Sequence, residues 1–367
     1  MTTAHAPTGE IELSLHGQPA HFAGGLHEVA PSTWAWLQPN GDLGESNAGF
    51  VADGDQVLLI DTLWDLQLTR RMLETAAAAG IARPDTVFNT HSDGDHCWGN
   101  QLLADCEIIS SSAARQLMTL DTPAELRRMQ SAGKLLGAIG RLPLPVVGSL
   151  NVPKLPRLPL REIGGLMAPF DWREIDLTLP TRTFDETLTL KVGGRSVDLI
   201  MVGPAHTGGD SIAWVPDVSV CFAADILFID CTPITWAGPV AGWLRALDTL
   251  TSLGAETFVP GHGPVCGPAE VALLREYFEW VAAEGVTQLD RGISPARAAR
   301  NLLQSDVFES LPWAAWEDPA RLVVTLCTEQ HVRNGGKGHL VGSGRSRAVM
   351  QMQRMKADLT RQRTATA

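Results

Sequence analysis

Five short apolar segments of this sequence each lead directly into a histidine or an aspartate. They are VLLID, TVFNTH, LIMVGPAH, VCFAAD and TFVPGH, which end at Asp61, His91, His206, Asp225 and His262. Short runs of aliphatic and β-branched residues are typical of buried strands. In α/β folds, residues just past the strand ends converge at one edge of the sheet, where ligand-binding and catalytic residues are usually found. The pattern therefore predicts a layered α/β protein whose strand-end residues share a site.

The segments between these ends predict alternating strands and helices. Hairpins are expected where AGFVADGDQVLLIDT turns at Gly54 and where ETLTLKVGGRSVDLIMV turns at Gly193. Helices are expected at 66–80 and 239–254, and each is closed by a glycine. The order of elements is similar in the two halves, which predicts an internal duplication within a layered α/β fold.

The same signals divide the chain into four stretches. Residues 1–26 are polar and are expected to cover an edge of the fold, whereas 27–270 form the main domain. Inside it, 134–185 is dense in leucine and proline, which is typical of a lid or binding loop. Residues 271–333 are expected to be helical. Residues 334–367 are expected to be a flexible basic tail with a short helix, because 333–367 carry eight Lys/Arg against one acid.

Charge and terminal sequence limit the partners and the location that we expect. The net charge of −12 argues against nucleic acid and anionic membranes as partners. The N-terminus lacks a signal peptide, and no apolar run approaches the ~18 residues of a membrane span. Six scattered cysteines without a C-x-x-C pair indicate free thiols in a reducing compartment. We expect a soluble cytoplasmic protein with a small-molecule substrate; a homodimer stays open.

The densest group of ionisable side chains lies in NTHSDGDHCWGN, residues 89–100. It holds His91, Asp93, Asp95 and His96 within six positions. With the other strand-end residues, the set reaches four histidines and four aspartates. Imidazole and carboxylate together are ligands for Zn²⁺, Fe or Mn. Core packing does not readily explain so many ionisable groups at strand ends, so the set predicts a metal site.

In these positions the sequence resembles the metallo-β-lactamase superfamily, whose signature is H-x-H-x-D-H followed by His, Asp and His. The resemblance covers about residues 27–270 and is carried by five motifs, which contain the following residues: His91, Asp95 and His96; His206 in PAHTGGDS; Asp225 in FAADILF; His262 in VPGHGPV; and Asp61 in LLIDT. It implies a four-layer αββα sandwich with an apolar insertion, C-terminal helices and a dinuclear metal site at one edge.

The resemblance also implies the role of each residue. One metal would be held by His91, Asp93 and His206, and the other by Asp95, His96 and His262. Asp225 would bridge the two metals, and Asp61 would orient a metal-bound histidine from behind.

An aspartate at 225 resembles glyoxalase II, lactonase and alkylsulfatase-like members, because true β-lactamases carry Cys or Ser there. The implied reaction is attack by a metal-bound hydroxide on an ester, lactone, thioester or similar bond of a medium-sized, partly hydrophobic substrate. Asp95 and Asp225 would then be the catalytic carboxylates, with Asp95 moving the proton.

Asp93 departs from the signature, which has histidine at this point. Two divalent metals, three aspartates and a bridging hydroxide sum to zero charge, so the site should attract anions less than the usual one. A carboxylate is a harder ligand than imidazole and favours Fe or Mn. Flavodiiron proteins of this superfamily place Glu here and bind iron. Direct ligation, contact through water and a mononuclear site all stay open.

Two functions follow from these alternatives. The first is a hydrolase with two divalent ions, for which Zn²⁺ is the first expectation and Fe or Mn remain open because of Asp93. The second is a di-iron, O₂-dependent oxidoreductase on the same fold. Trp64, Trp98 and Trp236 lie near motif ends and are candidates to line an apolar pocket, with core packing as the alternative.

Overall fold

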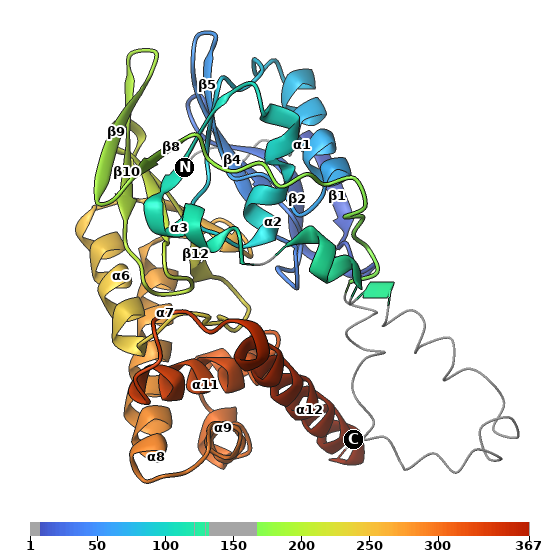
Figure 1. The fold of residues 1–367 in the computed structure, drawn as a ribbon, viewed down its shortest axis with the longest axis vertical. Coiled ribbons are helices and arrows are strands. Elements are labelled where there is room, and N and C mark those ends of the chain that lie inside the picture. The colour runs from blue at the N-terminus through green and yellow to red at the C-terminus, as the bar shows by residue number, and fades with distance from the viewer. Residues whose placement is uncertain (1–7, 121, 129, 132–166, 367) are drawn as a thin grey trace, which may run out of the picture.

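Two β-sheets face each other in the computed structural model, which describes residues 8–120, 122–128, 130–131 and 167–366 (Figure 1). The first sheet holds eight strands in chain order: β1 (Thr8–Leu13), β2 (Pro19–Ala30), β3 (Thr33–Leu37), β4 (Ala48–Asp53), β5 (Gln56–Ile60), β6 (Thr86–Phe88), β7 (Glu107–Ser111) and β8 (Arg182–Phe184). The second sheet has the order β13-β12-β11-β10-β9, and its strands are β9 (Thr187–Val192), β10 (Arg195–Met201), β11 (Ser211–Val215), β12 (Val220–Phe228) and β13 (Thr257–His262).

Helices cover the outer faces of both sheets. On the first sheet, α1 (Leu66–Ala78) packs through Met72 and Ala76. On the second sheet, α6 (Val240–Ser252) and α7 (Pro268–Trp280) pack through Trp243 and Phe278. Between the sheets lies a separate apolar core, whose residues include Leu58, Ile60, Val197, Leu199 and Phe222. The expected four-layer αββα sandwich is confirmed.

The parallel strands of each sheet end at the same edge. Strand β5 pairs in parallel with β6 across the crossover through α1, and β12 pairs in parallel with β13 across the crossover through α6. The start of α1 is capped by Asp65, which accepts a hydrogen bond from the Leu68 amide at 2.8 Å. The helix stops before Gly80, whose φ is 86°. These crossovers place the carboxyl ends of the parallel strands together, as the sequence predicts.

Short helices and a helical C-terminal region complete the chain. Near β6 and β7 lie α2 (Gly94–Cys97), the 3-10 helix Trp98–Leu103 and α3 (Ser112–Leu117). After α7 come a π-helical turn (Val281–Val286), α8 (Thr287–Asp290), α9 (Pro295–Leu303), α10 (Asp306–Glu309), α11 (Leu322–Arg333) and α12 (Gly342–Thr366). No helix in the described part of the chain combines the length and apolar composition that a membrane span requires.

The expectation of a flexible basic tail over 334–367 is wrong for most of its length. Residues 342–366 form the 25-residue helix α12, which packs on α11 and α9. Ala348, Met352 and Met355 are at most 9% exposed in this contact. They are spaced by four and three residues, which is the period of one helix face. The basic side chains between them obscure this period when only charge is counted.

Two further expectations are corrected by the strands. The described part of segment 1–26 is not a cover but β1 and most of β2, which continue the first sheet at its edge. Strand β8 lies inside the predicted insertion 134–185 and pairs with β7, so the insertion ends before it. Residues 134–166 of that insertion lie outside the described residues, and its lid role stays a prediction.

Candidate metal centre

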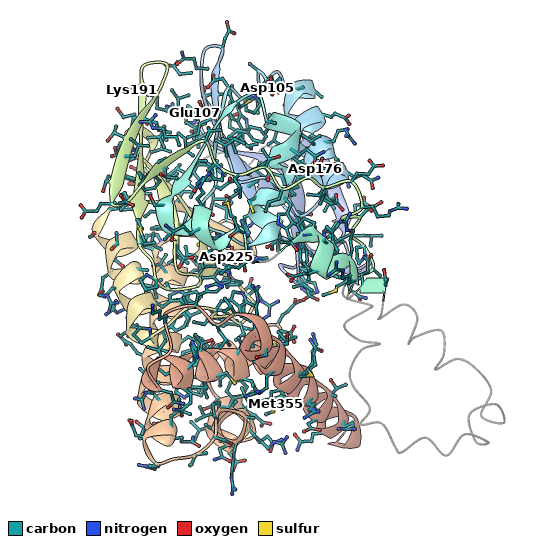
Figure 2. All side chains as sticks on the ribbon, in the orientation of Figure 1. Asp105, Glu107, Asp176, Lys191, Asp225 and Met355 are labelled. Atoms are coloured by element: carbon teal, nitrogen blue, oxygen red, sulfur yellow. The ribbon has the colours of Figure 1, made fainter. Side chains whose placement is uncertain are left out.

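The predicted site residues meet at the edge where the parallel strands end. Asp61 follows β5, and the 91–96 stretch follows β6 and includes α2. His206 lies in the loop after β10, and His262 is the last residue of β13. Asp225 lies in β12, and Figure 2 shows it where the sandwich adjoins the C-terminal helices. Five segments far apart in sequence thus reach one place.

Seven of these residues form two adjoining triads and a shared carboxylate. Ligand atoms of His91, Asp93 and His206 lie within 4.8 Å of one another, as do those of a second triad, formed by Asp95, His96 and His262. These are the two groups that the resemblance assigns to separate metals. That they bind metal stays a prediction, but the structure brings every predicted ligand together.

The carboxylate of Asp225 lies between the two triads. Its Oδ1 is 3.0 Å from Nε2 of His96, and its Oδ2 is 3.3 Å from Nε2 of His206. The same Oδ2 is 3.4 Å from Nε2 of His262 and 3.9 Å from Nε2 of His91. A carboxylate in contact with all four imidazoles has the position expected of a bridging ligand.

The backbone around Asp225 differs from the simple strand end that the sequence predicts. Strand β12 continues to Phe228, so Asp225 lies within the strand and not at its end. The pairing of β12 with β13 is irregular around Ala224, whose φ is 47°. On the facing strand, a Cβ at Gly261 would lie 1.8 Å from Asp225 Oδ1. A glycine at 261 therefore leaves the space that the carboxylate occupies.

Hydrogen bonds from behind orient three of the imidazoles. Nδ1 of His96 lies 2.9 Å from Oδ2 of Asp61, and Nδ1 of His206 donates to the Ile234 carbonyl at 2.7 Å. Nδ1 of His91 lies 2.9 Å from the Thr90 hydroxyl, which donates to Asp61 at 2.7 Å. Each Nδ1 thus faces an acceptor, and each Nε2 is directed into the cluster. Asp61 has the orienting position that the resemblance implies.

The donor set fits divalent cations. Nε2 of His91, Nε2 of His96 and Oδ1 of Asp225 are buried without a hydrogen-bond partner among the described residues. Buried polar atoms normally have partners, so these orphan atoms indicate a missing ligand. Imidazole nitrogen with carboxylate oxygen is the set that Zn²⁺ and related ions bind. A divalent ion at each triad would satisfy them.

The charges inside the cluster shift the pKa values of its members. Burial lowers the pKa of His206, but Asp225 and Asp93 outweigh it and raise this pKa to about 9. Burial raises the pKa of Asp225, yet His96 and the other imidazoles hold it well below its usual range. In the absence of a cation, the negative charge of the carboxylates thus favours the protonated form of the imidazole. Cation binding should therefore release protons.

We expect the Asp61→Asn variant to bind divalent cations about 10- to 100-fold more weakly, because it loses the carboxylate that orients His96. Asparagine tolerates the left-handed backbone at this position, where φ is 62°, so the fold should persist. Titration of metal-stripped protein with Co²⁺ would measure the affinity. Asp185→Asn, an exposed aspartate beyond β8, is the control. Equal affinities of the Asp61→Asn variant and the wild type would contradict the orienting role.

The three tryptophans proposed for the pocket are buried. Trp64 and Trp98 are 6% and 2% exposed and belong to one aromatic cluster with Phe170 and Trp172. Trp236 is 6% exposed, and its amide donates to the His206 carbonyl at 2.8 Å. The core-packing alternative therefore accounts for Trp64 and Trp98. Their contact with substrate stays a prediction.

A residue that sequence reasoning missed reaches the cluster from the C-terminal helix. Arg345 of α12 places Nη2 3.7 Å from Oδ2 of Asp93, and its Cζ lies 4.0 Å above the ring of Trp236. His339 is largely buried near Asp93 and His206, and burial lowers its pKa to about 4. The sequence held only an indirect signal for Arg345. The acid at position 93 can be balanced by a cationic side chain, and the C-terminal stretch is rich in Lys and Arg.

Asp210 holds the loop that carries His206. The carboxylate of Asp210 accepts hydrogen bonds from the Ala205 amide at 3.0 Å and from the Thr207 amide and hydroxyl at 2.9 and 2.6 Å. These bonds close the loop on both sides of His206. Asp210 therefore stabilises the loop.

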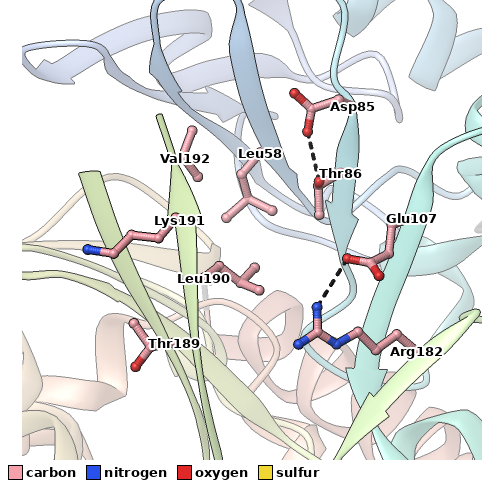
Figure 3. Close-up of a pocket in the computed structure, with 9 residues that line it drawn as sticks. All are labelled: Leu58, Asp85, Thr86, Glu107, Arg182, Thr189, Leu190, Lys191 and Val192. Atoms are coloured by element: carbon pink, nitrogen blue, oxygen red, sulfur yellow. Dashed lines mark hydrogen bonds and ion pairs between the residues drawn. The ribbon is translucent and has the colours of Figure 1, made fainter. Parts of the chain in front are cut away.

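A polar groove of about 210 Å³ lies away from the cluster (Figure 3). It is lined from both sheets, by residues at the starts of β6, β7 and β8 and by Thr189–Val192 of β9; Arg182 and Glu107 form an ion pair there at 3.3 Å. The cluster follows the carboxyl ends of the parallel strands, so this groove is at the opposite edge of the first sheet. It contains none of the predicted ligands.

The chain is similar to known proteins. A family model described as the metallo-beta-lactamase superfamily matches residues 41–262, a range that spans every ligand candidate. A metallo-beta-lactamase from Pontibacter korlensis aligns at 15% identity with a TM-score of 0.48, covering 69% of this chain and 98% of that one. The metallo-beta-lactamase FIM-1 from Pseudomonas aeruginosa, in its mono-zinc form, aligns at 15% identity with a TM-score of 0.47, covering 69% and 94%. No curated protein matches the chain.

Proposed function

Because the chain belongs to the metallo-β-lactamase superfamily, we propose that it is a dinuclear metal-dependent hydrolase of a medium-sized, partly hydrophobic ester, lactone or thioester. Members of this superfamily are mostly hydrolases and typically bind divalent metals, often zinc. The observation that carries the proposal is the position of Asp225, whose carboxylate contacts the imidazoles of both triads. Such a shared carboxylate suits two neighbouring cations.

Two divalent ions would be held by the two triads with Asp225 between them. We propose Zn²⁺, since four imidazoles and three carboxylates are ligands that it accepts. When bound, the ions supply a Lewis acid for the substrate oxygen and lower the pKa of coordinated water. The orphan nitrogens of His91 and His96 support this occupancy.

The exposure of the ligands indicates how substrate reaches the centre. The side chains of Asp93 and Asp95 are each 14% exposed, whereas His91, His96 and His206 are at most 1% exposed. Substrate would therefore approach from the aspartate side. Asp95 has Oδ2 3.6 Å from Nε2 of His262. Burial raises the pKa of Asp95, which suits a carboxylate that accepts a proton and passes it to the leaving group.

A di-iron oxidoreductase is the second candidate, and Asp93 is the observation that favours it. The structure places this carboxylate in the first triad, with Oδ2 3.2 Å from Nε2 of His206. A third carboxylate among the ligands favours harder ions such as Fe or Mn. Metal analysis of the first triad therefore tests the choice between the two reaction classes.

One experiment separates the two functions. Freshly purified protein is analysed for metal content and visible absorption, then assayed with lactones, thioesters, carboxylic esters and alkyl sulfates under defined metals. The hydrolase proposal expects a colourless protein with about two zinc ions and turnover of at least one substrate class. A coloured iron protein that consumes O₂ and hydrolyses none of them would support the second function and overturn the first.

A further inference from the structure

Helix α12 delivers a positive charge to the triad that contains Asp93. The guanidinium of Arg345 lies 3.7 Å from Oδ2 of Asp93 and stacks over the ring of Trp236. The same Oδ2 lies 3.2 Å from Nε2 of His206. One carboxylate oxygen therefore faces both the triad and the arginine.

Backbone hydrogen bonds fix the start of α12 against the site. The Trp236 amide donates to the His206 carbonyl at 2.8 Å, and the Leu340 amide donates to the Trp236 carbonyl at 2.7 Å. Next to it, Ala237 and His339 form an antiparallel bridge. Two steps of main-chain hydrogen bonding thus connect the ligand His206 to the segment that precedes Arg345. The backbone of the fold therefore fixes the position of the segment that carries Arg345.

We propose that Arg345 is a positioning residue that compensates the charge of Asp93 and thereby sets the cation affinity of the His91–Asp93–His206 triad. The inference rests on the proposed metal centre. A guanidinium keeps its charge at all working pH values, so its field on the triad is permanent. Arg345 and Asp93 are only 23% and 14% exposed, so water screens the pair weakly.

Arg345 offsets the charge that Asp93 adds to the triad, because its Nη2 lies 3.7 Å from Oδ2 of Asp93. Counting Arg345, the formal charge of a loaded centre becomes +1, the value that histidine at 93 would provide without an arginine. The expectation that Asp93 makes the site less attractive to anions is therefore offset by a residue from the C-terminal helix.

Two opposite effects on cation binding follow. A cation in the triad and the Arg345 guanidinium attract the same oxygen and repel each other, so loss of the arginine charge should tighten cation binding. Histidine at 93 would instead leave Arg345 beside the cation without a carboxylate between them. An Asp93→His variant should therefore bind cations poorly, although it restores the usual motif, and removal of the arginine should rescue it.

The test is a Co²⁺ titration of metal-stripped full-length protein, read by absorbance and by competition with a chelator. We expect Arg345→Met to bind cations about tenfold more tightly than wild type, and Arg345→Lys, which keeps the charge, to stay within about threefold. The exposed Arg347 lies on the same helix, so Arg347→Met is the matched control and should be unchanged. Asp93→His should bind at least about tenfold more weakly than Asp93→His/Arg345→Met.

Unchanged or weaker binding by Arg345→Met would overturn the inference, as would equal affinities of Asp93→His with and without the second substitution. Circular dichroism and limited proteolysis of each variant exclude loss of α12 as the cause. The outcomes are separable from the proposed function. Wild-type protein that binds two cations without this coupling defeats the inference alone, whereas coupling in a protein that hydrolyses no substrate defeats the hydrolase proposal alone.

Discussion

Replacing Asp225 with asparagine is expected to lower kcat/KM for the identified substrate by about three orders of magnitude and to remove at least one bound cation. The carboxylate contacts Nε2 of all four imidazoles, and no other shared anion lies between the described triads. Asparagine has the same shape and fits the space beside Gly261, so packing is preserved. Its amide lacks the negative charge that holds two cations together. Steady-state kinetics and metal analysis of the same preparation measure both effects.

Asp176→Asn is the control for the loss of a carboxylate. Asp176 is exposed, and Figure 2 shows it at the periphery of the molecule, away from Asp225. This variant should keep its metal content and rate. An Asp225→Asn protein that keeps two cations and the wild-type rate would show that the cations are held elsewhere.

Removing the cations is expected to lower the free energy of unfolding by about 4 kcal/mol relative to protein in metal at about 1,000 times its Kd. The ligands come from well-separated segments, so the unfolded chain cannot assemble them and the cations stabilise only the folded state. Without cations, the buried Nε2 atoms of His91 and His96 make no hydrogen bond in the described structure; they lie 3.9 and 3.0 Å from the Asp225 carboxylate. Urea unfolding with and without chelator measures the difference, and added Zn²⁺ should restore both stability and activity.

The pH dependence of this stabilisation has a definite sign. The pKa of His206 in the metal-free fold is raised to about 9 from 6.5 by Asp225 and Asp93, against the effect of burial. A raised folded-state pKa contributes stability that is complete below pH 6.5 and is lost as the pH rises through about 9. The benefit of the cations should therefore grow over this window. Equal unfolding midpoints with and without chelator at pH 8 would contradict a cation-stabilised cluster.

The ligand set could be predicted because each member follows a local pattern. The apolar runs before Asp61, His91, His206 and His262 identify strands from a few neighbouring residues, and the edge of the sheet brings their ends together. The resemblance to the superfamily assigned His91, His206 and His262 to the two triads that the structure shows, and Asp61 to a position behind His96. At Asp225 the local pattern missed the irregular pairing at Ala224, which depends on the neighbouring strand β13.

The C-terminal region was predicted less well, for a specific reason. Charge counting indicated a flexible tail, although Ala348, Met352 and Met355 recur with the period of a helix face. A helix with few apolar residues gains most of its stability from the surface on which it packs. That surface is formed by α9 and α11, and no local window of the tail contains it.

By itself, the sequence determined the strands and helices that carry the ligands, the layered fold and the identity of the seven candidate ligands, because hydrophobic periodicity and strand-end chemistry act over short distances. Only the tertiary structure decided that Gly261 leaves room for Asp225 and that Arg345 faces Asp93. The first contact joins neighbouring strands of one sheet, whereas the second joins the C-terminal helix to the sandwich. Their geometry depends on the volume and charge of the whole assembled core, which no single segment encodes.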